Sequence, residues 1–202
     1  MLFRSVTGII ENNKIIKNSN AQPRDMLVLT KPIGTGILST ALKKGMLNQT
    51  DEKTLIETMA ELNKSAAEVM QIVHANSCTD ITGFGLLGHL LEMMNASNTS
   101  AVIEFNKIKF FNNTFELAMS GNIPGGTKDN LAFTNRYVTY NEKISEIKKL
   151  MLNDAQTSGG LLISVPEIKV QQLYNLLVEK KVSSFFTIGK VISPDKFKIK
   201  II

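Results

Sequence analysis

The sequence contains no tryptophan, a single cysteine and only two histidines. One cysteine excludes an internal disulfide, and with two histidines it is a poor inventory for a zinc site with sulfur ligands. No apolar run approaches the about 18 residues that a membrane-spanning helix needs, and MLFRSVTGII at the N-terminus lacks the long apolar centre of a signal peptide. We therefore expect a cytoplasmic protein with no membrane partner.

The composition is that of an ordinary globular chain. It has 202 residues, 43% of them hydrophobic, and a formal net charge of +5. A chain of this size can bury a sizeable core. The lysines are spread along the chain and do not gather with a row of aromatic residues, so the charge does not indicate direct nucleic-acid binding. It would equally suit a phosphorylated ligand.

Hydrophobic periodicity predicts alternating strands and helices. Residues 4–16 look hairpin-like or extended, and 132–140 are ambiguous. The predicted strands are 26–30, 100–105, 160–165, 184–192 and 196–202. The predicted helices are 36–46, one long helix from about 51 to 74, 82–94, 115–120, 143–152 and 167–180. This order favours a layered α/β domain without internal repeats.

The segment TDITGFGLLGHLLEM, residues 79–93, carries the densest motif. Gly83, Gly85 and Gly88 spell G-x-G-x-x-G, and Glu104 follows 21 residues after the first glycine. A dinucleotide-binding turn needs a buried central strand directly before the first glycine. The preceding NSCTDIT is too short and polar for such a strand, so the motif does not predict a nicotinamide enzyme.

Asp80 lies just before the predicted helix and has two interpretations. Its carboxylate can cap the helix, or it can bind Mg²⁺ whose other ligands are substrate phosphates. Residue types alone favour the cap.

Further turns combine threonine with glycine. In KPIGTG, the backbone N–H groups of Gly34 and Thr35 could face an anion with Lys31 nearby, although no Walker A motif is present. Similar turns occur in PGGTKDN (124–130) and DAQTSGG (154–160). Each turn alone can be purely structural, but together they favour a phosphate-lined surface.

In this order and at these intervals, LTKPIGTGIL, TDITGFGLLGHLLEM, IPGGTKDN and DAQTSGGLLISV resemble the C-terminal half of the selenophosphate synthetase (selenide, water dikinase) family. The resemblance covers essentially the whole chain. It places the end of an N-terminal ATP-binding domain and the junction in residues 1–22, and a C-terminal α/β domain in 23–202. The implied fold is the layered mixed-sheet domain of the aminoimidazole ribonucleotide synthetase C-terminal type.

The resemblance implies an enzyme that converts ATP, hydrogen selenide and water into selenophosphate, AMP and phosphate with Mg²⁺, and that forms a homodimer. Asp80 matches the family's magnesium-binding aspartate, which reverses the preference for a cap. Several other positions match the nucleotide-side motifs: Thr79, Thr82, Gly83, Gly85, Lys31, Gly34 and Thr35. For His89, a packing role is expected.

The family's reactive cysteine or selenocysteine and its neighbouring lysine do not match any position of this chain, and Cys78 stands in the wrong motif to replace them. We therefore expect the chain alone to be inactive, with no catalytic nucleophile of its own. A non-catalytic nucleotide-binding or regulatory module is the alternative. A related enzyme such as a thiamine monophosphate kinase or a hydrogenase maturation factor is a second one.

Overall fold

The computed structural model describes residues 8–11 and 14–202. The hairpin expected at 4–16 lies partly outside these residues. Within them, the strands are β1 (Asp25–Leu29), β2 (Ser77–Asp80), β3 (Ser100–Ile103), β4 (Val138–Tyr140), β5 (Leu161–Pro166), β6 (Phe186–Ile192) and β7 (Ile199–Ile201). The α-helices are α1 (Thr35–Lys43), α2 (Gln49–Ala60), α3 (Lys64–Ile72), α4 (Gly85–Ala96), α5 (Thr114–Met119), α6 (Gly125–Thr134), α7 (Glu146–Leu152) and α8 (Val170–Glu179). Short 3₁₀ turns lie at Phe105–Lys107 and Glu167–Lys169.

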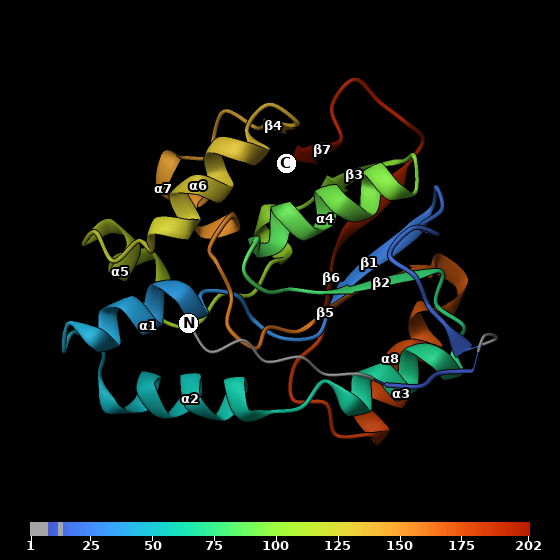
Figure 1. Ribbon diagram of the computed structural model, residues 1–202, viewed down its shortest axis with the longest axis horizontal. Helices are drawn as coiled ribbons and strands as arrows, with labels where there is room; N and C mark the ends of the chain where they lie inside the picture. The colour runs from blue at the N-terminus through green and yellow to red at the C-terminus, as the bar shows by residue number, and fades with distance from the viewer. Residues whose placement is uncertain (1–7, 12–13) are drawn as a thin grey trace.

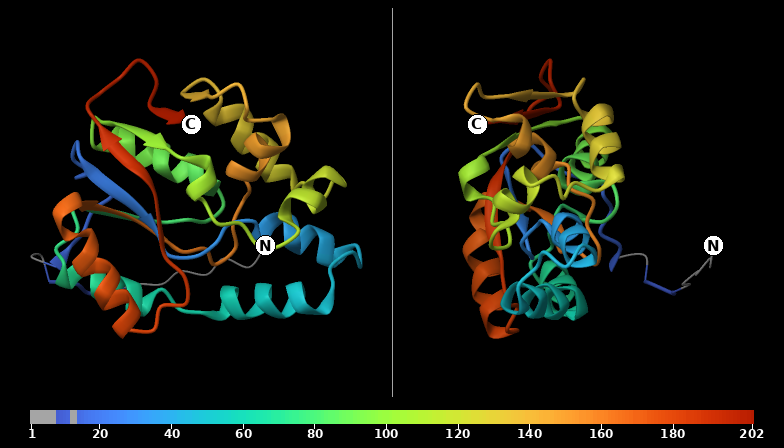
Figure 2. Two further views of the ribbon diagram at one scale, coloured as in Figure 1. Left: turned by 180° about the vertical axis from the view of Figure 1, so that it is seen from behind. Right: turned by 90° about the vertical axis from the view of Figure 1, so that its left-hand side faces the viewer.

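The described strands form one mixed sheet in the order β2-β5-β1-β6-β3-β7-β4. The pairs from β2 to β3 are antiparallel, and β7 pairs in parallel with both β3 and β4. The view from behind shows β6 in red running beside β1 in blue (Figure 2). The predicted α/β class and mixed sheet are confirmed.

Both faces of the central strands are covered. Leu27 and Leu29 of β1 pack into the cluster that contains the apolar side of α4, whereas Val28 faces the cluster formed with α3 and α8. Alternation along a strand sends neighbouring side chains to opposite faces, so a fully apolar strand requires two covering layers. Figure 1 shows α4 across one face and α3 beside α8 on the other. A third apolar cluster fills the space between α1, α2, α5 and α7.

Most predicted elements are confirmed, but the long helix at 51–74 is wrong. The structure ends α2 at Ala60 and starts α3 at Lys64. The Lys31 ammonium donates to the carbonyls of Thr58 and Glu61 at 2.9 and 2.7 Å, so it satisfies acceptors at the end of α2. These two acceptors lie 27 and 30 residues from Lys31 in sequence, so hydrophobic periodicity gave no sign of this contact.

Three smaller predictions also differ from the structure. The PGGTKDN segment is not only a turn, since α6 begins at Gly125, and the ambiguous segment 132–140 divides into the end of α6 and β4. The last strand covers only Ile199–Ile201, so Phe197 lies outside it and is 37% exposed.

Candidate functional site

Asp80 is the last residue of β2, and its exposed carboxylate lies at the start of the turn that leads to α4. β2 is an edge strand, antiparallel to β5 with Asp80 opposite Leu161. This short strand was not predicted from the sequence, but an antiparallel edge strand is not the buried central strand of a dinucleotide fold, so the prediction that such a strand is missing before the glycine motif is confirmed. The helix α4 begins at Gly85, not near Thr82, and has no side-chain cap. The cap interpretation of Asp80 is wrong, and in the described part of the chain no hydrogen bond ends on its carboxylate.

The 154–160 turn holds one side of the β2–α4 turn. Ile81 donates its N–H to the Gly160 carbonyl at 2.9 Å, and Gln156 donates its N–H to the Thr82 carbonyl at 3.0 Å. A Cβ at Gly159 would lie 2.1 Å from the Ile81 carbonyl oxygen, so the two turns touch backbone to backbone. This contact requires glycine.

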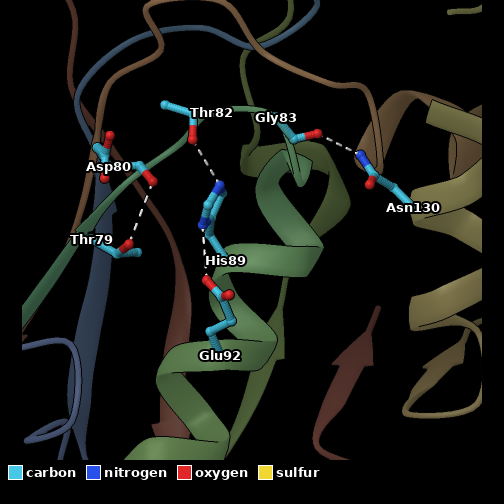
Figure 3. Close-up of polar contacts among 7 residues, drawn as sticks. All are labelled: Thr79, Asp80, Thr82, Gly83, His89, Glu92 and Asn130. Carbon is cyan, nitrogen blue, oxygen red and sulfur yellow. Dashed lines mark hydrogen bonds and ion pairs between the residues drawn. The ribbon is translucent and has the colours of Figure 1, made fainter. Parts of the chain in front are cut away.

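The helix α6 holds the other side. The buried Asn130 amide donates to the Gly83 carbonyl at 2.9 Å (Figure 3) and to the Asn153 carbonyl at 3.1 Å. Gly85 has φ +69, and a Cβ there would lie 2.8 Å from the Asn153 carbonyl oxygen. The start of α4 is thereby fixed against the end of α7. Sequence analysis missed Asn130 and Asn153, because an asparagine gives no local signal of a distant partner.

Beyond the turn, His89 joins two side chains of the same segment. Its Nε2 lies 3.1 Å from the Thr82 hydroxyl oxygen, and its Nδ1 lies 3.0 Å from Glu92 Oε2. The ring is buried, 8% exposed, and stacks at a tilt near Phe84 with ring centroids 5.6 Å apart. His89 therefore packs, as expected, and also links the turn to α4 by hydrogen bonds.

The β1–α1 turn contains the predicted Gly34 and Thr35, and both are engaged within the protein. The N–H of Gly34, the N–H of Thr35 and the Thr35 hydroxyl all point at Gln156 Oε1, at 3.0 to 3.2 Å. A buried side-chain acceptor from the 154–160 turn thus occupies the position that the sequence suggested for an anion.

Asp154 completes this arrangement. Its Oδ2 accepts the N–H groups of Gly36 at 3.0 Å and Ile37 at 3.2 Å, and its Oδ1 accepts the Thr127 hydroxyl at 3.0 Å. Asp154 is fully buried, and this burial raises the pKa of its carboxyl to about 6, against the opposing effect of its hydrogen-bond donors. The chain's own carboxylate therefore lies at the N-terminus of α1, where an anion is favourable.

Lys31 also has internal partners. Besides the two carbonyls at the end of α2, its ammonium donates to the Ser158 carbonyl at 2.9 Å. Burial lowers the pKa of Lys31, although the nearby Glu61 opposes this. Three carbonyl partners fix the side chain, so Lys31 joins α2 to the 154–160 turn.

Cys78 lies behind the turn and packs in the apolar cluster with α3 and α8. Burial, followed by the charge of Asp80, raises the pKa of its thiol to about 12. The thiolate is the nucleophilic form of cysteine. The side chain is therefore a packed residue, which agrees with its position outside the motif of the family's nucleophile.

Asp80 can serve as one ligand of a metal whose other ligands come from outside the described residues. In residues 8–11 and 14–202, no group of three or more His, Cys, Asp or Glu could hold a metal ion. Mg²⁺, however, commonly binds through one or two carboxylates while phosphates and waters supply the other oxygens. One exposed carboxylate on a fixed turn fits that donor set.

An apolar hollow of about 390 Å³ lies beside the turn, lined by Phe84, Gly88, Glu92, Asp129, Asn130 and Phe133.

Within the described ranges, none of the helices is long and apolar enough to cross a membrane.

Comparison with known proteins gives a family match over nearly the whole chain. Residues 22–202 match the AIR synthase related protein, C-terminal domain. Selenide, water dikinase of Caldanaerobacter subterraneus subsp. tengcongensis is 45% identical over 197 residues, which cover 96% of this chain and 56% of the relative. The chain therefore spans a little over half the length of this relative.

Two solved structures share the fold at low sequence identity. Thiamine-monophosphate kinase from Stenotrophomonas maltophilia superposes with a TM-score of 0.68 at 13% identity, over 95% of this chain and 54% of that one. Hydrogenase maturation protein HypE in complex with ATP superposes with a TM-score of 0.57 at 17% identity, over 88% of this chain and 45% of that one.

Proposed function

Because residues 22–202 belong to the C-terminal domain of the AIR synthase related protein family, we propose that this chain is the C-terminal portion of an ATP-dependent selenophosphate synthetase. The whole enzyme would convert ATP, hydrogen selenide and water into selenophosphate, AMP and phosphate. The 45% identity to a selenide, water dikinase supports this substrate class. The thiamine and hydrogenase-maturation proteins share only the fold, at 13% and 17% identity.

One observation carries the proposal at the level of residues. Asp80 presents a carboxylate that has no hydrogen-bond donor among the described residues, and two other segments hold the turn that follows it by hydrogen bonds to its backbone. A carboxylate that stabilised the fold through hydrogen bonds would have donors, as Asp154 has. We assign Asp80 as the magnesium ligand of this chain. When bound, Mg²⁺ would neutralise charge on the transferred phosphoryl groups.

The other matched residues take supporting roles in this proposal. Thr79, Thr82, Gly83 and Gly85 shape the loop on the ATP side. Lys31, Gly34 and Thr35 act on that side indirectly, because their hydrogen bonds fix the 154–160 turn against which the loop rests.

The rest of the active site would come from the N-terminal half of the whole enzyme. We propose that this half supplies the nucleophile, its lysine and further magnesium ligands, that residues 1–22 form the junction and 23–202 the C-terminal domain, and that the enzyme is a cytoplasmic homodimer. Splitting two phosphoanhydride bonds requires several cations and a positioned nucleophile. The chain alone should therefore be inactive.

The decisive experiment mixes this chain with a separately produced N-terminal half and follows Mg-ATP and selenide by phosphorus NMR. Selenide-dependent AMP and selenophosphate in the mixture, with neither half active alone, would support the proposal. Nucleotide binding without product in the mixture would favour a regulatory module instead. Product from this chain alone would contradict the assignment of the nucleophile to the other half.

A further inference from the structure

The side chains of Thr82, His89 and Glu92 form a continuous hydrogen-bonded chain from the Asp80 turn into α4 (Figure 3). The imidazole stands between the hydroxyl and the carboxylate, at 3.1 Å from the first and 3.0 Å from the second. We call this set the Thr82–His89–Glu92 chain. The sequence and the family resemblance placed Thr82 on the nucleotide side, predicted only packing for His89 and gave Glu92 no role.

The carboxylate fixes the polarity of this chain. An ionised Glu92 can only accept, so the Nδ1 atom of His89 must carry the proton between them. In the neutral ring, Nε2 is then an acceptor, and Thr82 must donate its hydroxyl hydrogen to it. A hydroxyl whose hydrogen is already donated to His89 can only accept hydrogen bonds from other partners.

The surroundings hold the ring in this position. A Cβ on Gly88 would lie 2.8 Å from the Phe84 Cβ, so the absence of a side chain lets Phe84 pack close to α4. Phe84 in turn lies against His89 with ring centroids 5.6 Å apart. Glu92 is about half exposed, with a side chain 49% accessible, and it lies on the wall of the apolar hollow. Of the three side chains, only the His89 imidazole, which connects Glu92 to Thr82, is deeply buried.

We propose that His89 and Glu92 are positioning residues that direct the Thr82 hydroxyl hydrogen inward, so that the Thr82 oxygen is an acceptor on the Asp80 side of the turn. An oxygen with free lone pairs suits a water bound to Mg²⁺, whose hydrogens point outward, and does not suit direct donation to a phosphate oxygen. The part of this inference that concerns Mg²⁺ rests on the proposed function. The direction of the hydrogen bonds among Thr82, His89 and Glu92 does not depend on the proposed function.

The first test reads the polarity directly in the full 202-residue chain. Long-range ¹H–¹⁵N NMR at pH 8 distinguishes the two neutral tautomers of an imidazole and the doubly protonated ring. The variant His74→Asn leaves His89 as the single histidine, and asparagine suits the positive φ of 50° at that position. The Nδ1–H tautomer of His89 supports the proposal, and either of the other two forms overturns it.

The second test separates the two ends of the ring in the reconstituted enzyme. Glutamine at position 89 places its amide near the position of Nε2 and can still accept from Thr82, whereas asparagine reaches only toward Glu92. We expect His89→Gln to remain within about 3-fold of wild type. We expect His89→Asn to need at least about 10-fold more Mg²⁺ for half-maximal rate, the usual size of an effect transmitted to a metal site through a hydrogen-bonded neighbour.

Matched variants exclude a purely structural effect. Thr82→Ser retains the hydroxyl and should resemble wild type, while Thr82→Val should resemble His89→Asn. Glu92→Ala should raise the Mg²⁺ requirement, whereas Asp129→Ala removes a carboxylate of the same hollow and should not. Equal Mg²⁺ requirements in His89→Gln and His89→Asn, or in Thr82→Ser and Thr82→Val, would overturn the proposal.

The two levels of inference fail separately. If the wild-type mixture makes no selenophosphate, the proposed function fails while the tautomer measurement still decides the polarity of the chain. If the mixture is active and the tautomer is the wrong one, the proposed function stands and the positioning role is refuted.

Discussion

The β1–α1 and β2–α4 turns look alike in sequence but are used in opposite ways. Both place threonine and glycine residues between a strand and a helix. In the first turn, Asp154 and Gln156 occupy the backbone N–H groups. In the second turn, neighbouring segments occupy the carbonyl groups of Thr82 and Gly83, and the Asp80 carboxylate has no donor among the described residues.

This difference shows which glycine turn can serve a ligand. A helix N-terminus attracts anions whatever their source, and in α1 the source is the chain's own Asp154. The first turn is closed and structural. The second turn is rigid because its carbonyls are bonded, yet its charged group remains open. Rigidity with an unused charge is what a ligand site requires.

The largest effect should come from removing the open charge. Asp80→Asn keeps the shape of the side chain but removes the anionic oxygen, so turnover of the reconstituted enzyme should fall at least about 1000-fold, as when a major electrostatic contact is lost. The free energy of unfolding should remain within about 0.5 kcal/mol of wild type. Rates from phosphorus NMR and urea denaturation measure both. The exposed Asp195→Asn is the control with the same charge change, and turnover of Asp80→Asn near wild type would refute the magnesium assignment.

The reverse pattern is expected at the closed turn. Asp154→Ala leaves the N–H groups of Gly36 and Ile37 and the Thr127 hydroxyl buried without their acceptor, so the free energy of unfolding should fall by about 4 kcal/mol. Urea denaturation of this chain tests it, with Asp195→Ala as the exposed control. A loss under about 1 kcal/mol would mean that the first turn is not held closed by this carboxylate.

Asp154 should also give the closed turn a dependence on pH. Its pKa is about 6 in the folded chain against the ordinary 3.8, so the folded state holds this proton more tightly than the unfolded state. The stability due to this group is fully present below about pH 4 and is lost as pH rises through about 6, by up to about 3 kcal/mol. The difference in unfolding free energy between wild type and Asp154→Asn, measured from pH 4 to 7, should show this slope. A flat difference would contradict it.

The sequence predicted the part of this comparison that depends on local pattern. Periodicity found the strand at 160–165 and the helix at 167–180, because their apolar spacing is set by the layers that they face. The family resemblance singled out Asp80. Residue types alone favoured a cap there, and the actual start of α4 at Gly85 shows why that preference failed.

The partners of each turn could not be predicted in the same way. Gln156 lies 122 residues from Gly34, and Asn130 lies 47 residues from Gly83. Lys31 lies beside a glycine turn and was therefore predicted to face an anion. Its three carbonyl partners lie at the end of α2 and in the 154–160 turn, far away in sequence, so the local pattern did not reveal them. Hydrogen bonds between distant segments leave no periodic signal, so sequence identified the turns but not which of them was already occupied.

The smallest effect concerns Cys78, which lies two residues before Asp80 yet belongs to the closed part of the molecule. It packs with α3 and α8, and burial raises the pKa of its thiol to about 12. Cys78→Ala should therefore lower the free energy of unfolding by about 1 kcal/mol, through one lost buried atom, and leave turnover unchanged. Because this is the single cysteine of the chain, a thiol reagent should label the folded protein slowly and the unfolded protein at once. Rapid labelling of the folded chain, or a turnover reduced more than about 10-fold, would mean that the Cys78 thiol is accessible from the side of Asp80. The distinction between a buried region and a ligand-facing region would then be wrong at this position.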